Sequence, residues 1–525
     1  MKKEENATSK NNIVEVKNNV VTLSKKILNI LNNVWNKIIL TIKKIAKMHF
    51  GKFSGTHVLV VGALALLLLF FMFKGIFGHD GIDYPVIYNN NDGDLYLMDR
   101  KTKNDDKAIK LANGESVSNV IYANTTNRYV LFQKNEALYL YDSKEKDETT
   151  KVVSDVSGYA FTEDDKYIVA LDEDDNLKVY NYKETKKIES DVSNIVAISK
   201  DYILYEKENN LYVRSVNPKK DDRLKVTDDY DTYIHFSEDG KNVLYINNDR
   251  ELYSFNIRKD EDKKIAKNVR TYYCDTESCE KLFYVENDET KSVYYYDGND
   301  SQKVAKDIYS VNAYDVENKQ LVYATLEDGK YNLYYQKATK DAVLIEDELE
   351  SVRTVKIFDG KAIYYITGEN EAKYVKINGA KIGNIKSIGE DVTGYFYLHK
   401  NGYVFVSDVK DNEGTLCLAK NGSVKEIDDD VNTNLITIGE NGKSIYYLKD
   451  YNTSGDLYVS KGGKGREIEK DVYSYEYVKD DLIYLIKDYS VSKSRGDLYR
   501  YTNKSVQVAE DVTRIASSPV YFELN

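Results

Sequence analysis

Short runs of alternating apolar and polar residues fill the chain beyond residue 84. Within residues 472–512 the four runs are Ser474–Val478, Leu482–Ile486, Asp497–Tyr501 and Ser505–Ala509. Alternation with a period of two over four to six residues predicts β-strands, and the Gly, Asn, Asp and Lys between the runs predict turns. No stretch beyond residue 80 has a helical period. This part of the chain is therefore predicted to be all-β.

A recurring pentapeptide marks the third run of each unit. It reads GDLYL at 93–97, GDLYV at 455–459 and GDLYR at 496–500. Looser copies are EALYL (136–140), DNLKV (175–179), NNLYV (209–213), RELYS (250–254), KSVYY (291–295), YNLYY (331–335), EAKYV (371–375) and GTLCL (414–418). Most of these eleven copies lie 39 to 43 residues apart. Four strands in each such repeat predict a β-propeller array of about eleven blades.

Eleven blades allow either one large ring or two rings. Two rings are favoured, because the inner strands of one wide ring would leave its centre unfilled. The imperfect copy at 371–375 is a candidate junction between rings. The tail SSPVYFELN (517–525) is similar to DYPVIYNNN (83–91), which favours a closing blade with strands from both ends. Such closure removes a free sheet edge.

The turn between the first two strands of a unit carries a second motif. It reads HFSEDGKNVLYI at 235–246, with looser versions TIGENGKSIYYL (437–448), AFTEDDKYIVAL (160–171) and AYDVENKQLVYA (313–324). This element resembles the F-S-x-D-G-K-x-(L/I)-x-(F/Y) element of bacterial TolB-type, WD40-like repeat proteins. The resemblance covers roughly residues 84–525 and implies a propeller, but no particular activity, because such repeats serve many functions. No Trp-Asp dipeptide ends the third strand, unlike in true WD40 repeats.

Residues 56–77 read THVLVVGALALLLLFFMFKGIF. Twenty-two helical residues match the ~30 Å hydrocarbon core of a bilayer. The run starts more than fifty residues into the chain and no small-x-small site follows it, so an uncleaved transmembrane helix is predicted. Several lysines precede it, whereas Lys74 stands almost alone at its end. The positive-inside rule then places residues 1–55 in the cytoplasm and 84–525 outside.

Residues 24–48 form an amphipathic pattern beside this segment. Its apolar stripe consists of Ile27, Leu31, Val34, Ile38, Ile42 and Ile45. Lysines and asparagines lie opposite, which predicts a basic helix on the anionic membrane surface. Docking to a cytoplasmic partner is the alternative.

The net charge and the tyrosine content of the chain both change near residue 80. Residues 1–54 hold eleven Lys and three Glu, and since the whole chain carries −12, the part beyond Lys74 carries −21. A strongly acidic body argues against binding to nucleic acid. All 48 tyrosines lie beyond residue 83, and most are expected to pack between blades.

The candidates for catalysis are few. His235 and His399 are the histidines of the repeats, and no G-x-S-x-G elbow is present. We therefore predict no enzyme, no cofactor and no metal site. An Asp-Val pair closes six units, at 155–156, 191–192, 391–392, 430–431, 471–472 and 511–512. Its regular spacing predicts a structural turn or an acceptor that bridges blades.

Cys274 and Cys279 flank the sequence DTES where other units have their first hairpin. A disulfide between them is predicted for an extracytoplasmic domain. Two cysteines without histidine partners make a poor zinc site. Cys417 replaces the tyrosine of the pentapeptide and is expected to be a small buried hydrophobe.

These patterns together predict a single-pass, membrane-anchored extracytoplasmic propeller. Its partners would be the lipid bilayer and a protein or polysaccharide ligand outside the cytoplasm, such as an envelope protein or a cell-wall polymer. The expected function is non-catalytic binding or scaffolding. The alternative is a transmembrane sensor that relays ligand binding to a cytoplasmic partner of residues 1–55.

Overall fold

The computed structural model describes residues 85–100, 108–114, 117–122, 128–145, 149–231, 234–479 and 482–515. The predicted helices at 24–48 and 56–77 and the tail at 517–525 lie outside these residues. All regular elements of the described part are β-strands, and no helix in it is long and apolar enough to cross a membrane. Gly81–Asn525 form one compact unit. The prediction that the repeats are all-β is confirmed for this part of the chain.

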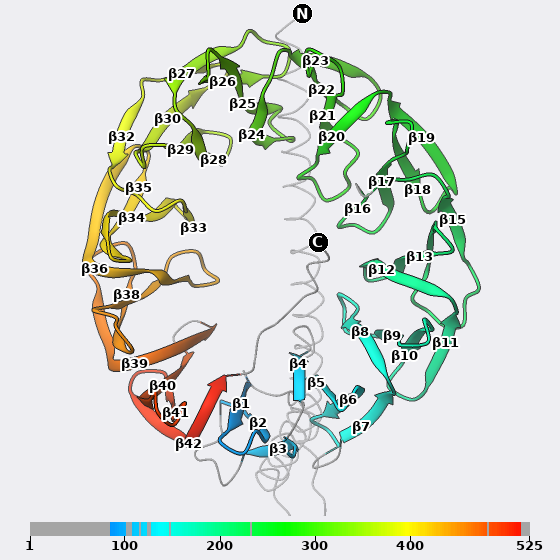
Figure 1. Ribbon diagram of the computed structural model, residues 1–525, viewed down its shortest axis with the longest axis vertical. Helices are drawn as coiled ribbons and strands as arrows, with labels where there is room; N and C mark the ends of the chain where they lie inside the picture. Colours follow the sequence, from blue (N-terminus) through cyan, green and yellow to red (C-terminus); the bar gives the residue numbers. More distant parts are fainter. Residues whose placement is uncertain are drawn as a thin grey trace, which may run out of the picture. The chain divides into compact units, whose positions relative to one another are not determined.

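Six sheets have four antiparallel strands each, and the strands of each sheet are consecutive in the sequence (Figure 1). The first three are β4 (Val117–Tyr122), β5 (Tyr129–Lys134), β6 (Ala137–Asp142) and β7 (Thr149–Val153); β8 (Val156–Phe161), β9 (Ile168–Asp172), β10 (Leu177–Tyr180) and β11 (Thr185–Glu189); and β12 (Val192–Ile198), β13 (Tyr202–Lys207), β14 (Asn210–Ser215) and β15 (Leu224–Thr227). The next three are β16 (Ile234–Phe236), β17 (Asn242–Ile246), β18 (Leu252–Asn256) and β19 (Glu261–Ala266); β20 (Val269–Tyr273), β21 (Leu282–Glu286), β22 (Val293–Tyr296) and β23 (Ser301–Ala305); and β24 (Ser310–Asp315), β25 (Gln320–Glu327), β26 (Lys330–Lys337) and β27 (Val343–Leu349).

Two further sheets contain the remaining strands. A five-stranded sheet consists of β28 (Val352–Phe358), β29 (Ala362–Thr367), β30 (Ala372–Asn378), β31 (Lys381–Ile382) and β32 (Lys386–Gly389). A thirteen-stranded sheet consists of β33 (Tyr397–His399), β34 (Gly402–Lys410), β35 (Glu413–Lys420), β36 (Ser423–Ile438), β37 (Ile445–Lys449), β38 (Gly455–Ser460), β39 (Arg466–Lys479), β40 (Leu482–Ser490), β41 (Arg495–Tyr501) and β42 (Ser505–Ile515), followed by β1 (Val86–Asn90), β2 (Leu95–Met98) and β3 (Ile109–Ala112).

The thirteen-stranded sheet divides into four of the predicted repeats at its long strands β36, β39 and β42. Each of these begins as the last strand of one repeat and continues as the first strand of the next. In β36, residues 423–432 pair with β35 and residues 431–438 pair with β37. The connection stays within one continuous strand in this region, with a left-handed residue such as Asp430 at the change of partner, so neighbouring repeats merge into one sheet.

All eleven copies of the pentapeptide fall on the third strand of their repeat, as predicted. GDLYL leads into β2, GDLYV forms β38 and GDLYR lies in β41. In several copies the first letters occupy the turn that precedes this strand, where Gly93 has a φ of 78° and Asp175 a φ of 60°. Gly and Asp adopt this left-handed conformation at low cost, which explains their use at these two positions. Gly455 and Gly496 lie inside β38 and β41 instead.

The first and last described strands close the array. Tyr88 to Asn90 of β1 pair with Val512 to Ile515 of β42, and the hydroxyl of Thr513 donates to the carbonyl of Asn89 at 3.2 Å. The sequence placed the closing strand at 517–525, which lies outside the described residues. The structure shows that residues 512–515 already supply a closing strand.

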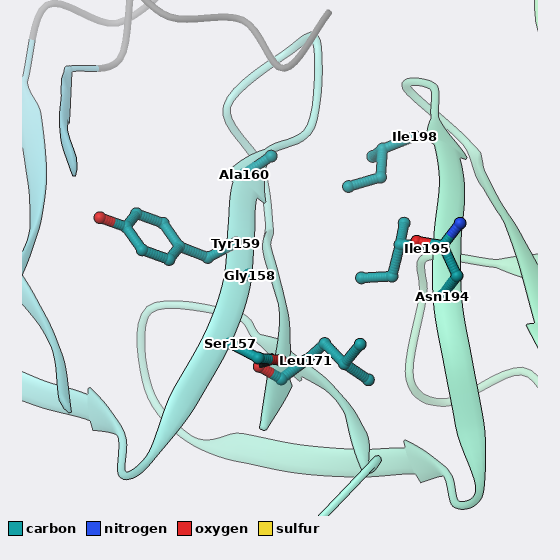
Figure 2. Close-up of a pocket in the computed structure, with 8 residues that line it drawn as sticks. All are labelled: Ser157, Gly158, Tyr159, Ala160, Leu171, Asn194, Ile195 and Ile198. Carbon is teal, nitrogen blue, oxygen red and sulfur yellow. Dashed lines mark hydrogen bonds between the residues drawn. The ribbon is translucent and has the colours of Figure 1, made fainter. Parts of the chain in front are cut away.

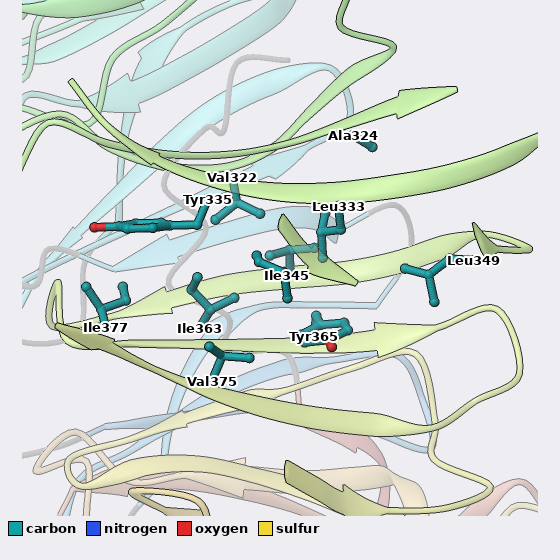
Figure 3. Close-up of a cluster of buried hydrophobic side chains, with 11 residues drawn as sticks. Val322, Ala324, Leu333, Tyr335, Ile345, Leu349, Ile363, Tyr365, Val375 and Ile377 are labelled. Carbon is teal, nitrogen blue, oxygen red and sulfur yellow. The ribbon is translucent and has the colours of Figure 1, made fainter. Parts of the chain in front are cut away.

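Eleven buried hydrophobic clusters lie between consecutive repeats. One joins β24–β27 to β28–β31, with Leu333 and Tyr335 facing Ile363 and Tyr365 (Figure 3). Another joins β39–β42 to β1 and β2 through residues such as Val512, Val86 and Tyr88. Each of the remaining nine clusters joins one of the nine remaining pairs of neighbouring repeats. Packing therefore continues across the candidate junction at 371–375, because Ala372 and Tyr374 belong to the cluster with Tyr403 and Phe405.

Paired aromatic rings on the second and third strands recur in eight repeats. One directly opposed pair from each of these repeats is Tyr88–Tyr96, Phe132–Tyr139, Tyr205–Tyr212, Tyr245–Tyr253, Tyr284–Tyr294, Tyr323–Tyr334, Tyr364–Tyr374 and Tyr447–Tyr458. Their ring centroids lie 5.1 to 5.8 Å apart. Such cross-strand pairs stabilise antiparallel sheets, and fifteen of the 48 tyrosines take part in these eight pairs.

The Asp of each Asp-Val pair has a left-handed backbone. The φ angles of the six lie between 44° and 56°, and each following Val is at most 3% exposed. The Val192 N–H donates to the carbonyl of Asp175 in the preceding repeat at 2.9 Å. The pair thus turns the chain from the last strand of one repeat into the first strand of the next, as the sequence predicted.

Candidate functional site

A cavity of about 460 Å³ lies where the hairpin ends of two consecutive repeats meet. It is lined by His399, Asn401, Leu418, Lys420, Asn421, Ser423, Val424, Lys425, Lys461 and Gly462. We call it the lysine pocket. Two hairpins of one repeat end at this pocket: the one between its first and second strands, β33 and β34, and the one between its third and fourth strands, β35 and β36. The hairpin between β38 and β39, the third and fourth strands of the next repeat, completes the lining.

Asn-Gly turns build the walls of the lysine pocket. Asn421 and Gly422 both have positive φ, of 52° and 73°, in the two-residue turn between β35 and β36. Asn-Gly is the preferred sequence for this turn type. A Cβ on Gly422 would overlap the ring of Tyr374 in the preceding repeat. The turn is therefore fixed against its neighbour, and Lys420 and Lys425 extend from a rigid hairpin.

The pocket is cationic although the repeats as a whole are acidic. Lys420, Lys425 and Lys461 are exposed, no acidic residue lines the cavity, and none of the ion pairs in the described part of the chain involves these lysines. Three ammonium groups without carboxylate partners favour an anionic ligand.

His399 adds no charge to the pocket. Its Nδ1 accepts a hydrogen bond from the N–H of Asn401 at 3.2 Å, so Nε2 carries the proton and donates to the carbonyl of Lys443 at 3.3 Å. Burial lowers the pKa of His399, and the nearby charge of Lys420 lowers it further. The imidazole is therefore neutral near pH 7 and supports the turn, rather than acting as a base.

A smaller cavity of about 190 Å³ lies between the first strands β8 and β12 (Figure 2). Its walls are mostly apolar, with Leu171, Ile195 and Ile198 around it. Gly158 and Asn194 follow β-bulges at the start of these strands. The hydroxyl of Ser157 already donates to the carbonyl of Leu171 at 3.1 Å. The cavity offers little polar chemistry for a ligand.

The structure joins Cys274 and Cys279 by a disulfide, with 5.7 Å between their Cα atoms. Cys417 is a free, buried cysteine opposite Phe405. The prediction that no histidine accompanies the cysteine pair is wrong: His235 lies beside both sulfurs. His235 precedes Cys274 by almost one repeat, so their proximity follows from the packing of adjacent sheets. From the sequence, only an alignment of consecutive repeats could have revealed that His235 lies near the two cysteines.

Glu476 is a half-buried carboxyl on the first-strand half of β39, opposite Tyr484. Burial raises the pKa of Glu476 to about 7. Because its pKa is near 4.3 in the unfolded chain, the folded state keeps the proton longer, and stability falls as the pH rises between about 4.3 and 7.

We predict that Glu476→Gln raises the free energy of unfolding by about 2 kcal/mol at pH 8 and changes it little near pH 4. Urea denaturation followed by circular dichroism at both pH values measures this. Glu510→Gln, at an exposed position, is the control. An equal effect of Glu476→Gln at pH 4 and pH 8 would contradict the assignment.

Consecutive four-stranded antiparallel sheets that pack face to face and close through β1 and β42 define a propeller-like, all-β protein. No family model and no curated protein sequence matches the chain. Among solved structures, a eukaryotic initiation factor is 10% identical with a TM-score of 0.43, and the match covers 82% of this chain and 96% of that one.

Two further solved structures are similar to parts of the fold. The tricorn protease is 13% identical with a TM-score of 0.26, covering 83% of this chain and 59% of the protease. Hsv2 of Kluyveromyces lactis is 12% identical with a TM-score of 0.26, covering 49% of this chain and 95% of Hsv2. These low scores carry no argument about what the chain binds or catalyses.

Proposed function

We propose that the chain is a membrane-anchored, extracytoplasmic β-propeller that binds an anionic ligand without catalysing a reaction. The observation that carries the proposal is the lysine pocket: three exposed, unpaired lysines around a cavity of about 460 Å³ in a strongly acidic domain. Phosphate or carboxylate groups of an acidic cell-wall polymer have the chemistry that such a pocket recognises.

The propeller in this proposal is a single ring of eleven blades. The sequence favoured two rings. A single ring is supported by the eleven clusters, which link each repeat to the next and the last repeat to the first. Anchorage rests on the apolar segment 56–77, and its orientation on the lysines before it. The tether would keep the propeller close to polymers at the cell surface.

The test is binding of the full chain, held in a mild detergent, to a glycerol phosphate polymer. We expect saturable binding that weakens as salt is added, because exposed charges are screened within about 10 Å at 0.1 M salt. The triple variant Lys420→Gln, Lys425→Gln, Lys461→Gln is expected to bind about ten-fold or more weakly. Isothermal titration calorimetry measures both affinities.

The control variant removes three positive charges from lysines that do not line the lysine pocket. Lys166, Lys306 and Lys361 are 67%, 73% and 76% exposed, and each pairs with a nearby aspartate. Changing these three to Gln is expected to alter affinity by less than about three-fold. A wild-type chain that does not bind the polymer, or an equal loss in both triple variants, would overturn the proposal.

A further inference from the structure

Three side chains with metal-binding atoms converge where two consecutive repeats meet. A ring nitrogen of His235 and the sulfurs of Cys274 and Cys279 all lie within 4.8 Å of one another. His235 belongs to β16, whereas the cysteines flank the turn between β20 and β21. Cys279 is buried, and the other two residues are half-buried. Imidazole nitrogen and thiolate sulfur are the ligands that Zn²⁺ prefers, in spacings that begin with two cysteines a few residues apart.

The cysteine turn is held in place by hydrogen bonds that do not involve the disulfide. The side-chain amide of Asn242 donates to the carbonyl of Ser278 at 3.0 Å, and the N–H of Asp239 donates to the carbonyl of Glu277 at 3.1 Å. On the other side, the N–H of Val316 donates to Asp275 Oδ1 at 3.1 Å. These contacts fasten the turn to the repeats before and after it, so cleavage of the disulfide leaves both cysteines close to His235.

The disulfide closes a short loop, since its cysteines are five positions apart. Loop-closure entropy grows with loop length, so this bond contributes less stability than one that joins distant segments.

We propose that the Cys274–Cys279 disulfide masks a Zn²⁺ site whose ligands are Cys274, Cys279 and His235. A dithiol reductant opens the disulfide: two electrons and two protons pass to the cysteine sulfurs, and the dithiol becomes a disulfide. Zn²⁺ then displaces one proton from each thiol and binds two thiolates and the imidazole. Three protein ligands leave a fourth position for water or another donor. This proposal does not depend on the lysine pocket.

The test compares the full chain before and after treatment with a phosphine, which reduces the disulfide and takes an oxygen from water. Co²⁺ is the spectroscopic probe, because thiolate–cobalt bonds give charge-transfer absorption. We expect no such band for the oxidised chain and one Co²⁺ bound per reduced chain, displaced by Zn²⁺. Cys274→Ser should abolish the band, and His235→Ala should weaken Co²⁺ binding about ten-fold or more.

Cys417→Ser is the matched control, because it removes the free thiol of the described residues and leaves the cluster intact. It should bind Co²⁺ as the wild-type chain does. The proposal fails if the reduced chain gives no thiolate–cobalt band, if the oxidised chain binds equally well, or if His235→Ala changes nothing. Loss of the β-sheet circular dichroism spectrum on reduction would also overturn it, because the site requires the folded repeats.

Discussion

Replacing Glu189 with alanine is expected to lower the free energy of unfolding by about 3–5 kcal/mol, one of the two largest effects predicted for this chain. Glu189 is a carboxylate, 10% exposed, at the end of β11. Lys207 Nζ lies 2.8 Å from its Oε1, and Arg223 Nη1 and the Tyr205 hydroxyl lie 3.1 and 3.2 Å from its Oε2. Its removal leaves these donors without their acceptor.

The cost comes mainly from cations that cannot reach water. Lys207 is 14% exposed and Arg214, whose guanidinium lies 4.0 Å from Glu189, is 5% exposed. A buried charge that loses its partner keeps the desolvation penalty and loses the attraction that offset it. Because Lys207 belongs to β13 in the next repeat, the substitution weakens the contact between two neighbouring sheets.

Asp191 provides a control on the same turn. It lies 3.8 Å from the same Lys207 ammonium but is 72% exposed, and exposed ion pairs contribute about 0–1 kcal/mol. Urea denaturation of both alanine variants should be followed by circular dichroism, because Trp35 lies far from the repeats in sequence. An effect of Glu189→Ala no larger than that of Asp191→Ala would refute the role of the network.

The effect of Glu189 should depend on pH. Burial by itself would raise the pKa of Glu189, but hydrogen bonds from Lys207 and Arg223 outweigh it and hold the pKa below its usual value. A carboxyl with a lowered pKa contributes stability above its unfolded pKa and loses it as the pH falls through the folded value. The difference between wild type and Glu189→Ala should therefore shrink as the pH falls below about 4.3.

The same arrangement recurs at other contacts between repeats. Glu346 accepts from the Tyr365 hydroxyl at 2.6 Å and pairs with Lys373, and Asp428 accepts from the Tyr447 hydroxyl at 2.9 Å and pairs with Lys449. In each case the acid lies on the last strand of one repeat and its donors on the next. The tyrosine hydroxyls thus have polar partners inside otherwise apolar interfaces, which is why tyrosine is used there so often.

The sequence predicted the repeats because the information for them is local. The alternation within a strand, the Gly-Asp that opens GDLYV and the Asp-Val pair are each visible within five residues, and their spacing shows the period. The Tyr-x-Lys spacing in Tyr205 to Lys207 and Tyr447 to Lys449 was also visible. This spacing identifies the networks of Glu189 and Asp428 only when it is aligned with the last strand of the preceding repeat, which carries the acid.

The sites were harder to predict because they form between repeats. His235 meets Cys274 and Cys279 through sheet packing, and Lys461 meets Lys420 and Lys425 through the ends of hairpins in neighbouring repeats. No single repeat contains either set. Likewise, β36 continues from one repeat into the next through the connection between them, and the periodicity within each repeat does not reveal this.

Val512→Asp is expected to open the closing contact and to lower the free energy of unfolding by more than about 3 kcal/mol. Val512 is fully buried, pairs with Asn90 of β1 and belongs to the cluster that joins the last repeat to the first. A carboxylate at this position would be buried without a cationic partner, which is among the most costly of single changes. It would also separate β1 from β42 and leave two exposed sheet edges.

Val506→Asp is the matched control, because Val506 lies on the same strand β42 but is 37% exposed. It should change the free energy of unfolding by no more than about 0.5 kcal/mol. Hydrogen exchange separates a local from a global effect: in Val512→Asp the amides of β1 should exchange faster than those of β13, whereas Val506→Asp should leave both protected. Equal protection of β1 in the two variants would show that the pairing of β1 with β42 does not hold the first and last repeats together.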